Sequence, residues 1–238
     1  MRVRGVVVGV ILGTFAGWPA AAAAEPVSFP HGTIDQEFTV AQPGAATGSS
    51  FTGSYHAADD PNGDPPYMRR MTFYPPAGTR YDTTVPKRCR ASDEELELGG
   101  PAACPEGSRL GGGTATGKFM GSVNTLPVDV FNNTGEVIMV ISSPGVFTVS
   151  RGKLGADGTT EFSSPTCYPS VSVAGCPVDN ALQLGSTVTM PAYVRDGRSY
   201  LTAPPECPAS GYWDSTVRFW WADGTEDTVP MQQACAAP

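Results

Sequence analysis

One stretch of the sequence has the residue types and spacing of a loop that holds phosphate groups in nucleotide-binding enzymes. Residues 112–118 fit G-x-x-x-x-G-K, but Phe119 stands where the metal-binding Ser or Thr is required. Such a loop follows a buried strand and begins a helix. Here a Cys-Pro turn precedes the glycines, and Thr114 and Thr116 alternate with smaller apolar residues, as in a strand. We therefore interpret residues 111–119 as a glycine-rich bulge leading into a strand, and we expect no nucleotide cofactor.

A second set of candidate ligands lies in the acidic segment 55–67. Asp60, Asn62 and Asp64 occupy alternate positions, which is the spacing of oxygen ligands in a calcium-binding loop. The Gly and the acid that an EF-hand places further along its loop are missing. Two alternatives remain: an irregular calcium site, with calcium as the one possible cofactor, or a polar Asp-Pro-Asn-Gly turn between strands.

Catalytic residues are difficult to place. The chain has two histidines, His31 and His56, and no G-x-S-x-G motif marks a nucleophilic serine. His56 lies beside Asp59 and Asp60, which makes it either an oriented base or a surface histidine next to a polar turn. Two groups of acids could supply a glycosidase pair, although solvation alone explains them: Glu94, Glu95 and Glu97, and Asp223, Glu226 and Asp227. We predict no catalytic residue, and a secreted hydrolase of polysaccharides that uses Asp or Glu is the alternative.

Aromatic residues near the C-terminus are the remaining candidates for ligand binding. In an unbroken strand, Trp213, Phe219 and Trp221 share one face and Tyr212 and Trp220 share the other. One set is expected in the core, and the other could stack on sugar rings or contact a partner protein. The possible ligand platform therefore comprises Tyr212, Trp213, Trp220 and Trp221.

The cysteines indicate disulfide bonds. Six cysteines form an even set without the closely spaced pairs of a zinc site. Disulfides persist in oxidising compartments outside the cytoplasm. Among the 15 possible connectivities of six cysteines, we predict bonds between sequence neighbours: Cys89–Cys104, Cys167–Cys176 and Cys207–Cys235.

Residues 1–24 have the pattern of a secretory signal peptide. Arg2 and Arg4 precede an apolar run, and Ala22 and Ala24 satisfy the preference of signal peptidase, which predicts cleavage after Ala24. The strongly apolar run is shorter than the ~20 residues that span a bilayer, so an uncleaved anchor is disfavoured. We expect a secreted, extracellular protein without a membrane span in the mature chain.

The charge of the chain argues against nucleic acid as a partner. Removal of residues 1–24 takes away two Arg and no acid, which changes the formal net charge from −8 to −10. Lys and Arg are scattered, whereas binding to nucleic acid depends on clustered cations that neutralise phosphates.

Turn signals between short apolar segments predict an all-β fold. Asp196-Gly197 predicts a type I′ hairpin, and further turns are expected at Arg151-Gly152, Asp157-Gly158 and Asp223-Gly224. The apolar run 137–142 is typical of a strand covered on both faces.

The sequence also predicts one helix and the extent of the domain. Ser92 is a predicted helix N-cap with Glu95 completing a capping box, and Gly99 can end that helix. We predict an antiparallel two-sheet β-sandwich with one short helix and disulfide-stapled loops over residues 35–238. Residues 25–34 are expected to form a poorly ordered N-terminal segment.

The segment CPEGSRLGGGTATGKF within residues 86–119 resembles the CPxxSxxGxGxA-type stretches of exported, uncharacterised actinobacterial-type proteins. The resemblance implies export and a β-rich fold, and it assigns no activity and no catalytic residue. Together these features predict a secreted, non-catalytic binding or structural protein, extracellular or associated with the cell envelope. The alternatives are the hydrolase and a calcium-stabilised adhesion module.

Overall fold

The computed structural model describes residues 25–119, 121–143, 146–163 and 181–235. Its main feature is one antiparallel sheet of 12 strands in the order β1-β2-β4-β12-β7-β8-β9-β10-β11-β5-β16-β17. The strands of this sheet are Val27–Phe29 (β1), Gly32–Phe38 (β2), Ser49–Tyr55 (β4), Met68–Tyr74 (β5), Arg109–Phe119 (β7), Ser122–Asn133 (β8), Glu136–Ser143 (β9), Val146–Leu154 (β10), Thr160–Ser163 (β11), Ala181–Met190 (β12), Tyr212–Trp221 (β16) and Glu226–Ala234 (β17).

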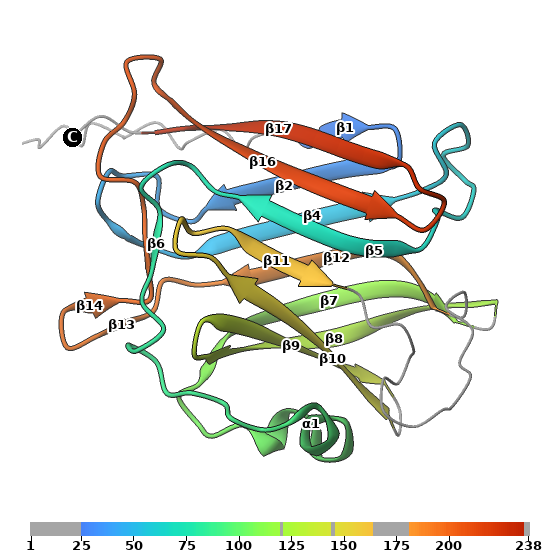
Figure 1. The fold of residues 1–238 in the computed structure, drawn as a ribbon, viewed down its shortest axis with the longest axis horizontal. Coiled ribbons are helices and arrows are strands. Elements are labelled where there is room, and N and C mark those ends of the chain that lie inside the picture. The colour runs from blue at the N-terminus through green and yellow to red at the C-terminus, as the bar shows by residue number, and fades with distance from the viewer. Residues whose placement is uncertain (1–24, 120, 144–145, 164–180, 236–238) are drawn as a thin grey trace, which may run out of the picture.

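The sheet curls until its two edges approach each other. In Figure 1, β16, β5 and β11 lie in front of β2, β4 and β12. The ladder from β8 through β9 and β10 to β11 carries the hydrogen bonds from one layer to the other. The predicted all-β class is confirmed, but the expectation of two separate sheets is not met. The hydrogen bonds form one nearly closed, barrel-like sheet.

Side chains close the seam, which we define as the gap between the β1–β2 hairpin and β17. The Gln233 side chain imitates a neighbouring strand. Its Oε1 accepts from the Phe38 backbone N–H at 2.8 Å, and its Nε2 donates to the Phe38 carbonyl at 2.8 Å. Phe29 stacks on Phe219 with ring centroids 5.1 Å apart. The edges are therefore held together without a continuous backbone ladder.

The core lies between the two layers of the curled sheet. One cluster joins Ile34 and Tyr55 on β2 and β4 to Val217, Phe219 and the other inward side chains of β16 and β17. A second cluster includes Phe38, Val128 and Trp213. These alternate positions face inward because side chains alternate across a strand.

The glycine-rich stretch 111–119 lies within β7, as predicted, and a bulge interrupts its pairing with β8 between Arg109 and Gly111. A Cβ on Gly113 would lie 1.9 Å from the Thr187 carbonyl oxygen of β12. A Cβ on Gly111 would lie 2.1 Å from the Thr189 carbonyl oxygen. The glycines therefore permit close approach of two strands rather than phosphate binding.

The helix α1 (Asp93–Gly99) has the predicted capping box. The Ser92 N–H donates to Glu95 Oε2 at 2.8 Å, and the Glu95 N–H donates to Ser92 Oγ at 3.2 Å. The helix ends at Gly99, as predicted; the C-cap is Gly100, which has a positive φ of 59°, and a 3-10 turn, Gly100–Ala103, follows. Leu96 packs against the outer face of β8, β9 and β10, which is why β9 is covered on both faces.

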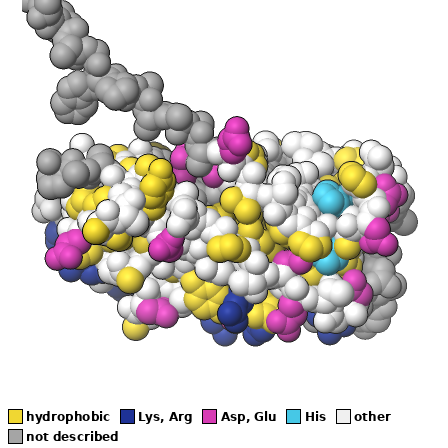
Figure 2. Space-filling view, turned by 90° about the horizontal axis from the view of Figure 1, so that it is seen from above, with side chains coloured by type: hydrophobic (Ala, Val, Ile, Leu, Met, Phe, Trp, Pro, Cys, Tyr) yellow, Lys and Arg dark blue, Asp and Glu magenta, His cyan; other side chains and the backbone are white. Residues whose placement is uncertain are grey.

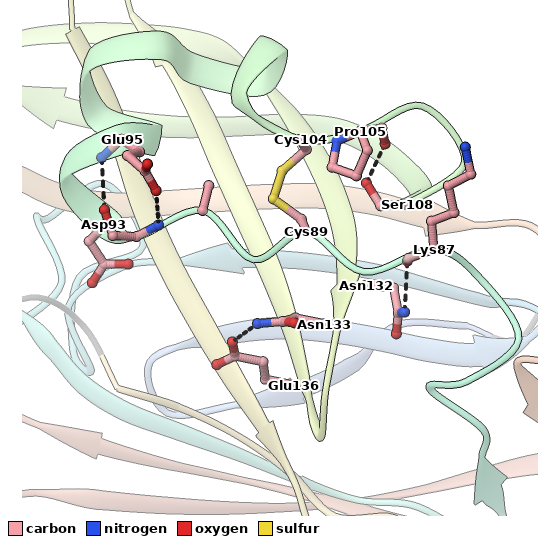
Figure 3. The surroundings of a disulfide bond; sticks show 12 residues. Lys87, Cys89, Asp93, Glu95, Cys104, Pro105, Ser108, Asn132, Asn133 and Glu136 are labelled. Atoms are coloured by element: carbon pink, nitrogen blue, oxygen red, sulfur yellow. Dashed lines mark hydrogen bonds between the residues drawn. A yellow bond between two sulfur atoms is a disulfide. The ribbon is translucent and has the colours of Figure 1, made fainter.

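A disulfide between Cys89 and Cys104 closes the loop that carries this helix, as Figure 3 shows. The Cys89 N–H donates to the Asn132 carbonyl of β8 at 2.8 Å. The Asn132 side chain donates to the carbonyl oxygens of Thr83 and Lys87 at 3.0 and 2.9 Å. The segment before the helix is thus fixed by a covalent bond and by a buried amide.

Smaller elements complete the fold. A three-stranded sheet orders Ala46–Thr47 (β3), Leu201–Thr202 (β15) and Arg80–Tyr81 (β6) as β3-β15-β6. Val194–Arg195 (β13) and Arg198–Ser199 (β14) form the predicted hairpin, with Asp196 and Gly197 at positive φ.

Two expectations from the sequence are wrong, and two others lie outside the described residues. No turn occurs at Arg151-Gly152, because β10 continues there and pairs with β9 and β11. The segment 25–34 contains β1 and the start of β2 rather than a poorly ordered stretch, and Ile34 is fully buried.

The proposed signal peptide and the proposed Cys167–Cys176 bond lie outside the described residues. No helix in the described part of the chain is long and apolar enough to span a membrane.

Candidate functional site

The proposed aromatic platform is divided between the core and two distant surface points. Trp213 and Trp221 are each 2% exposed and belong to the core, so the prediction that they contribute to a ligand platform is wrong. Tyr212 is 46% exposed at the start of β16, whereas Trp220 lies on the outer face near its end. The two are eight positions apart on one strand, about 27 Å at the usual rise of a strand, so they do not form one surface.

Trp220 instead belongs to a surface built by two neighbouring strands. Arg70 of β5 lies directly opposite Trp220 of β16, and its guanidinium carbon is 3.8 Å from the ring centroid. Arg218 reaches diagonally across the same pair of strands, with its guanidinium carbon 5.6 Å from the Tyr74 ring centroid. We call the outer-face residues of this region the arginine–aromatic face; they are Arg70, Thr72 (itself buried), Tyr74, Glu161, Arg218, Trp220 and Glu226, which lies opposite Trp220 on β17.

Glu161 of β11 borders this face. Its carboxylate lies 3.8 Å from Arg70 Nη1 and accepts a hydrogen bond from the Thr72 hydroxyl at 3.4 Å. Arg70 and Glu161 side chains are about equally exposed, at 41% and 42%, so this ion pair is open to solvent and weak. The face is therefore accessible, with its long side chains oriented by neighbours on a rigid sheet.

A buried histidine–carboxyl pair lies at one end of the seam. His31 Nδ1 is 2.6 Å from Asp227 Oδ2, and the same oxygen accepts from Trp221 Nε1 at 2.8 Å. His31 also packs against the Trp221 ring at 4.9 Å between centroids. The pair joins the β1–β2 turn to β17, so its evident role is to hold the two edges of the sheet together.

Sequence reasoning missed this pair, because 196 residues separate its members and no local pattern connects them. The histidine that the sequence favoured, His56, has a different environment. Its Nδ1 lies 2.7 Å from the Ala57 carbonyl oxygen, and no contact orients it toward Asp59 or Asp60. Figure 2 shows the two histidine side chains near one end of the face on view, with acidic side chains around them.

The residues proposed as calcium ligands serve a turn and an ion pair. Asp60 Oδ1 accepts from the Asn62 N–H at 2.9 Å, the pattern of an Asx turn. Asp64 pairs with Lys118 Nζ of β7 at 2.5 Å. Within the ranges that the structure describes, no group of three or more His, Cys, Asp or Glu side chains is placed to hold a metal ion. The polar-turn alternative accounts for these contacts.

Three of the acids considered for a glycosidase pair have local partners: Glu95, Asp223 and Asp227. Glu95 completes the capping box of α1. The Thr225 hydroxyl and N–H hold the pKa of the Asp223 carboxyl below its ordinary value by hydrogen bonding in the hairpin turn. Asp227 is bound by His31. These contacts stabilise a helix, a turn and the seam.

Two disulfides join the neighbouring cysteines named above: Cys89 with Cys104, and Cys207 with Cys235. The second bond links the end of β17 to the loop before β16. Trp213 Nε1 donates to the Glu206 carbonyl at 2.8 Å beside it. Both disulfides therefore fix segments that enclose the core.

The chain matches no protein-family model, and neither a curated protein nor a solved structure is significantly similar to it. The roles of the arginine–aromatic face and the seam are therefore inferred from the geometry of this chain alone.

Proposed function

We propose that the protein is a secreted, non-catalytic binding protein, and that its ligand contacts the arginine–aromatic face. The observation that carries this proposal is the arrangement of Arg70 on Trp220 and Arg218 on Tyr74 on one outward face of β5 and β16. Arg and Trp are enriched among the residues that dominate binding energy at interfaces. Here they project from paired strands rather than from a loop.

The surrounding structure supports the proposal by making this face rigid. The inward side chains of the same strands, Phe219 and Val217, are fully buried in the core, and β16 pairs along its length with β17. Side chains on a sheet with a packed opposite face are held in place, so less conformational entropy is lost on binding. The two disulfides and the proposed signal peptide favour a role outside the cytoplasm.

A glycan panel tests the proposal. The oxidised protein beginning at Glu25 is compared with Trp220→Ala and with Tyr212→Ala on immobilised glycans. Tyr212 is the matched control, because it is an exposed aromatic residue on the outer face of the same strand but far from Arg70. We expect Trp220→Ala to weaken the binding of any retained glycan about tenfold or less, and Tyr212→Ala to preserve it. Equal binding by all three proteins would refute the assignment of the face.

A further inference from the structure

We propose that the ligand of the arginine–aromatic face is an anionic glycan that carries carboxylate groups. The inference rests on the proposed function, and it adds the chemical class of the ligand. It follows from how the two guanidinium groups are held, and from what this leaves available to a ligand.

The Trp220 ring is not an open platform for sugar stacking. The Arg70 guanidinium carbon lies 3.8 Å from the ring centroid, so a cation already occupies the exposed side of the ring. Stacking uses the flat face of a guanidinium and leaves the N–H donors around its rim. A group with two acceptor oxygens, such as a carboxylate, matches that rim with two parallel hydrogen bonds.

Two acids neighbour these donors, Glu161 of β11 and Glu226 opposite Trp220 on β17, and neither saturates them. Glu161 Oε2 lies 3.8 Å from Arg70 Nη1, beyond hydrogen-bonding distance, and it accepts from Thr72 instead. Arg70 is thus oriented by the ring and only weakly neutralised by Glu161.

Arg218 supplies a second cation of the same kind. It is exposed, it lies over Tyr74, and it forms no ion pair within the described ranges. In the register of β5 and β16, Arg218 pairs with Thr72 while Arg70 pairs with Trp220, so the two arginines are diagonal neighbours. Such neighbours are about 7–8 Å apart at the backbone. Two oriented cations at this separation suit a chain with repeated anionic groups.

The protein as a whole is acidic. The chain has a formal net charge of −8. On the face on view in Figure 2, which lies over β17 and the β1–β2 hairpin, acidic side chains occur from end to end and Lys and Arg keep to the borders. A densely charged polyphosphate would be repelled by so acidic a protein.

Polygalacturonate provides the test, because its fully methyl-esterified form has the same backbone without the negative charge. We expect the protein to bind polygalacturonate, to bind the ester at least tenfold more weakly, and to lose affinity when salt is raised. Arg218→Ala and Arg70→Ala should each weaken binding about tenfold, the loss of one charge-assisted contact. Arg218→Lys keeps the charge but loses the two-pronged geometry, so it should also weaken binding. Tyr212→Ala is the control variant and should bind as the unaltered protein does. An unchanged melting temperature in every variant shows that the substitutions leave the fold intact.

The outcomes separate this inference from the proposed function. Equal binding of polygalacturonate and its ester, with dependence on Trp220, would overturn the anionic class and leave the face as a binding site. Stronger binding of a single-stranded DNA oligonucleotide than of polygalacturonate would also overturn it. Polygalacturonate binding that survives both Arg70→Ala and Arg218→Ala would overturn the role of the arginines. Failure of every glycan on the panel to bind would contradict the proposed function itself.

Discussion

Replacement of His31 by alanine should destabilise the protein strongly, because the His31–Asp227 pair closes one end of the seam. Both side chains are nearly buried, at 6% and 7% exposure, with 2.6 Å between Nδ1 and Oδ2. Removal of one partner from a buried pair typically costs about 3–5 kcal/mol, because the remaining polar group stays desolvated. Trp221 still donates to Asp227, which places the expected loss near the lower end of that range.

Urea denaturation at neutral pH, followed by tryptophan fluorescence, measures this loss. For a domain with a urea m-value of about 2–3 kcal/mol/M, the midpoint should fall by about 1–2 M without a change in slope. His31→Asn is the matched control, because Asn Nδ2 places a donor near the position of Nδ1, and it should lose less stability. A loss below about 1 kcal/mol for His31→Ala, the size of a surface contact, would refute the claim that this pair holds the seam.

Three further predictions concern the helix and the edge of the sheet. Replacement of both Cys89 and Cys104 by Ala should lower the free energy of unfolding by about 3 kcal/mol, given the 15-residue separation. An unchanged denaturation midpoint would contradict a stabilising role of this disulfide. Ser92→Ala should cost about 1 kcal/mol in the same assay by removing the N-cap, and Ser92→Asp should not. Burial, and then the charge of Asp35, raise the pKa of Glu37. When folding raises the pKa of a carboxyl group, the group favours the folded state at pH values below its ordinary pKa, and this contribution is lost as the pH rises. Glu37→Gln should therefore raise the melting temperature at pH 7 but not at pH 3. Equal shifts at both pH values would contradict this assignment.

Local signals in the sequence predicted local structure well. Asp196-Gly197 forms its hairpin because both residues adopt positive φ, and Ser92 caps α1 through bonds that span three residues. Arg151-Gly152 resembles a turn in sequence, yet β10 runs through it. The Phe162 ring of β11 covers Gly152, where a Cβ would lie 2.4 Å from the ring. The conformation at Gly152 therefore depends on a neighbouring strand, which the local sequence does not reveal.

Long-range pairing explains what the sequence could not provide. Alternation predicted which aromatic residues of β16 face inward, but not that Arg70, 150 positions earlier, would cover Trp220. The same limit applies to the fold. The strand pattern indicated a β-rich domain, whereas the continuity of the sheet depends on pairings such as β11 with β5, which join residues nearly 90 positions apart.

Ligand is expected to bind beside Trp220, through the arginine that covers its ring, and not at the buried tryptophans. Beyond residue 24 the chain has three tryptophans, Trp213, Trp220 and Trp221, whose indole N–H groups have different surroundings. Proton–nitrogen NMR spectra of the oxidised protein, recorded as polygalacturonate is added, would resolve these three signals. Our account predicts that the Trp220 signal, assigned by its loss in Trp220→Phe, shifts progressively while those of Trp213 and Trp221 remain in place. Saturable binding that leaves the Trp220 signal unmoved would contradict it.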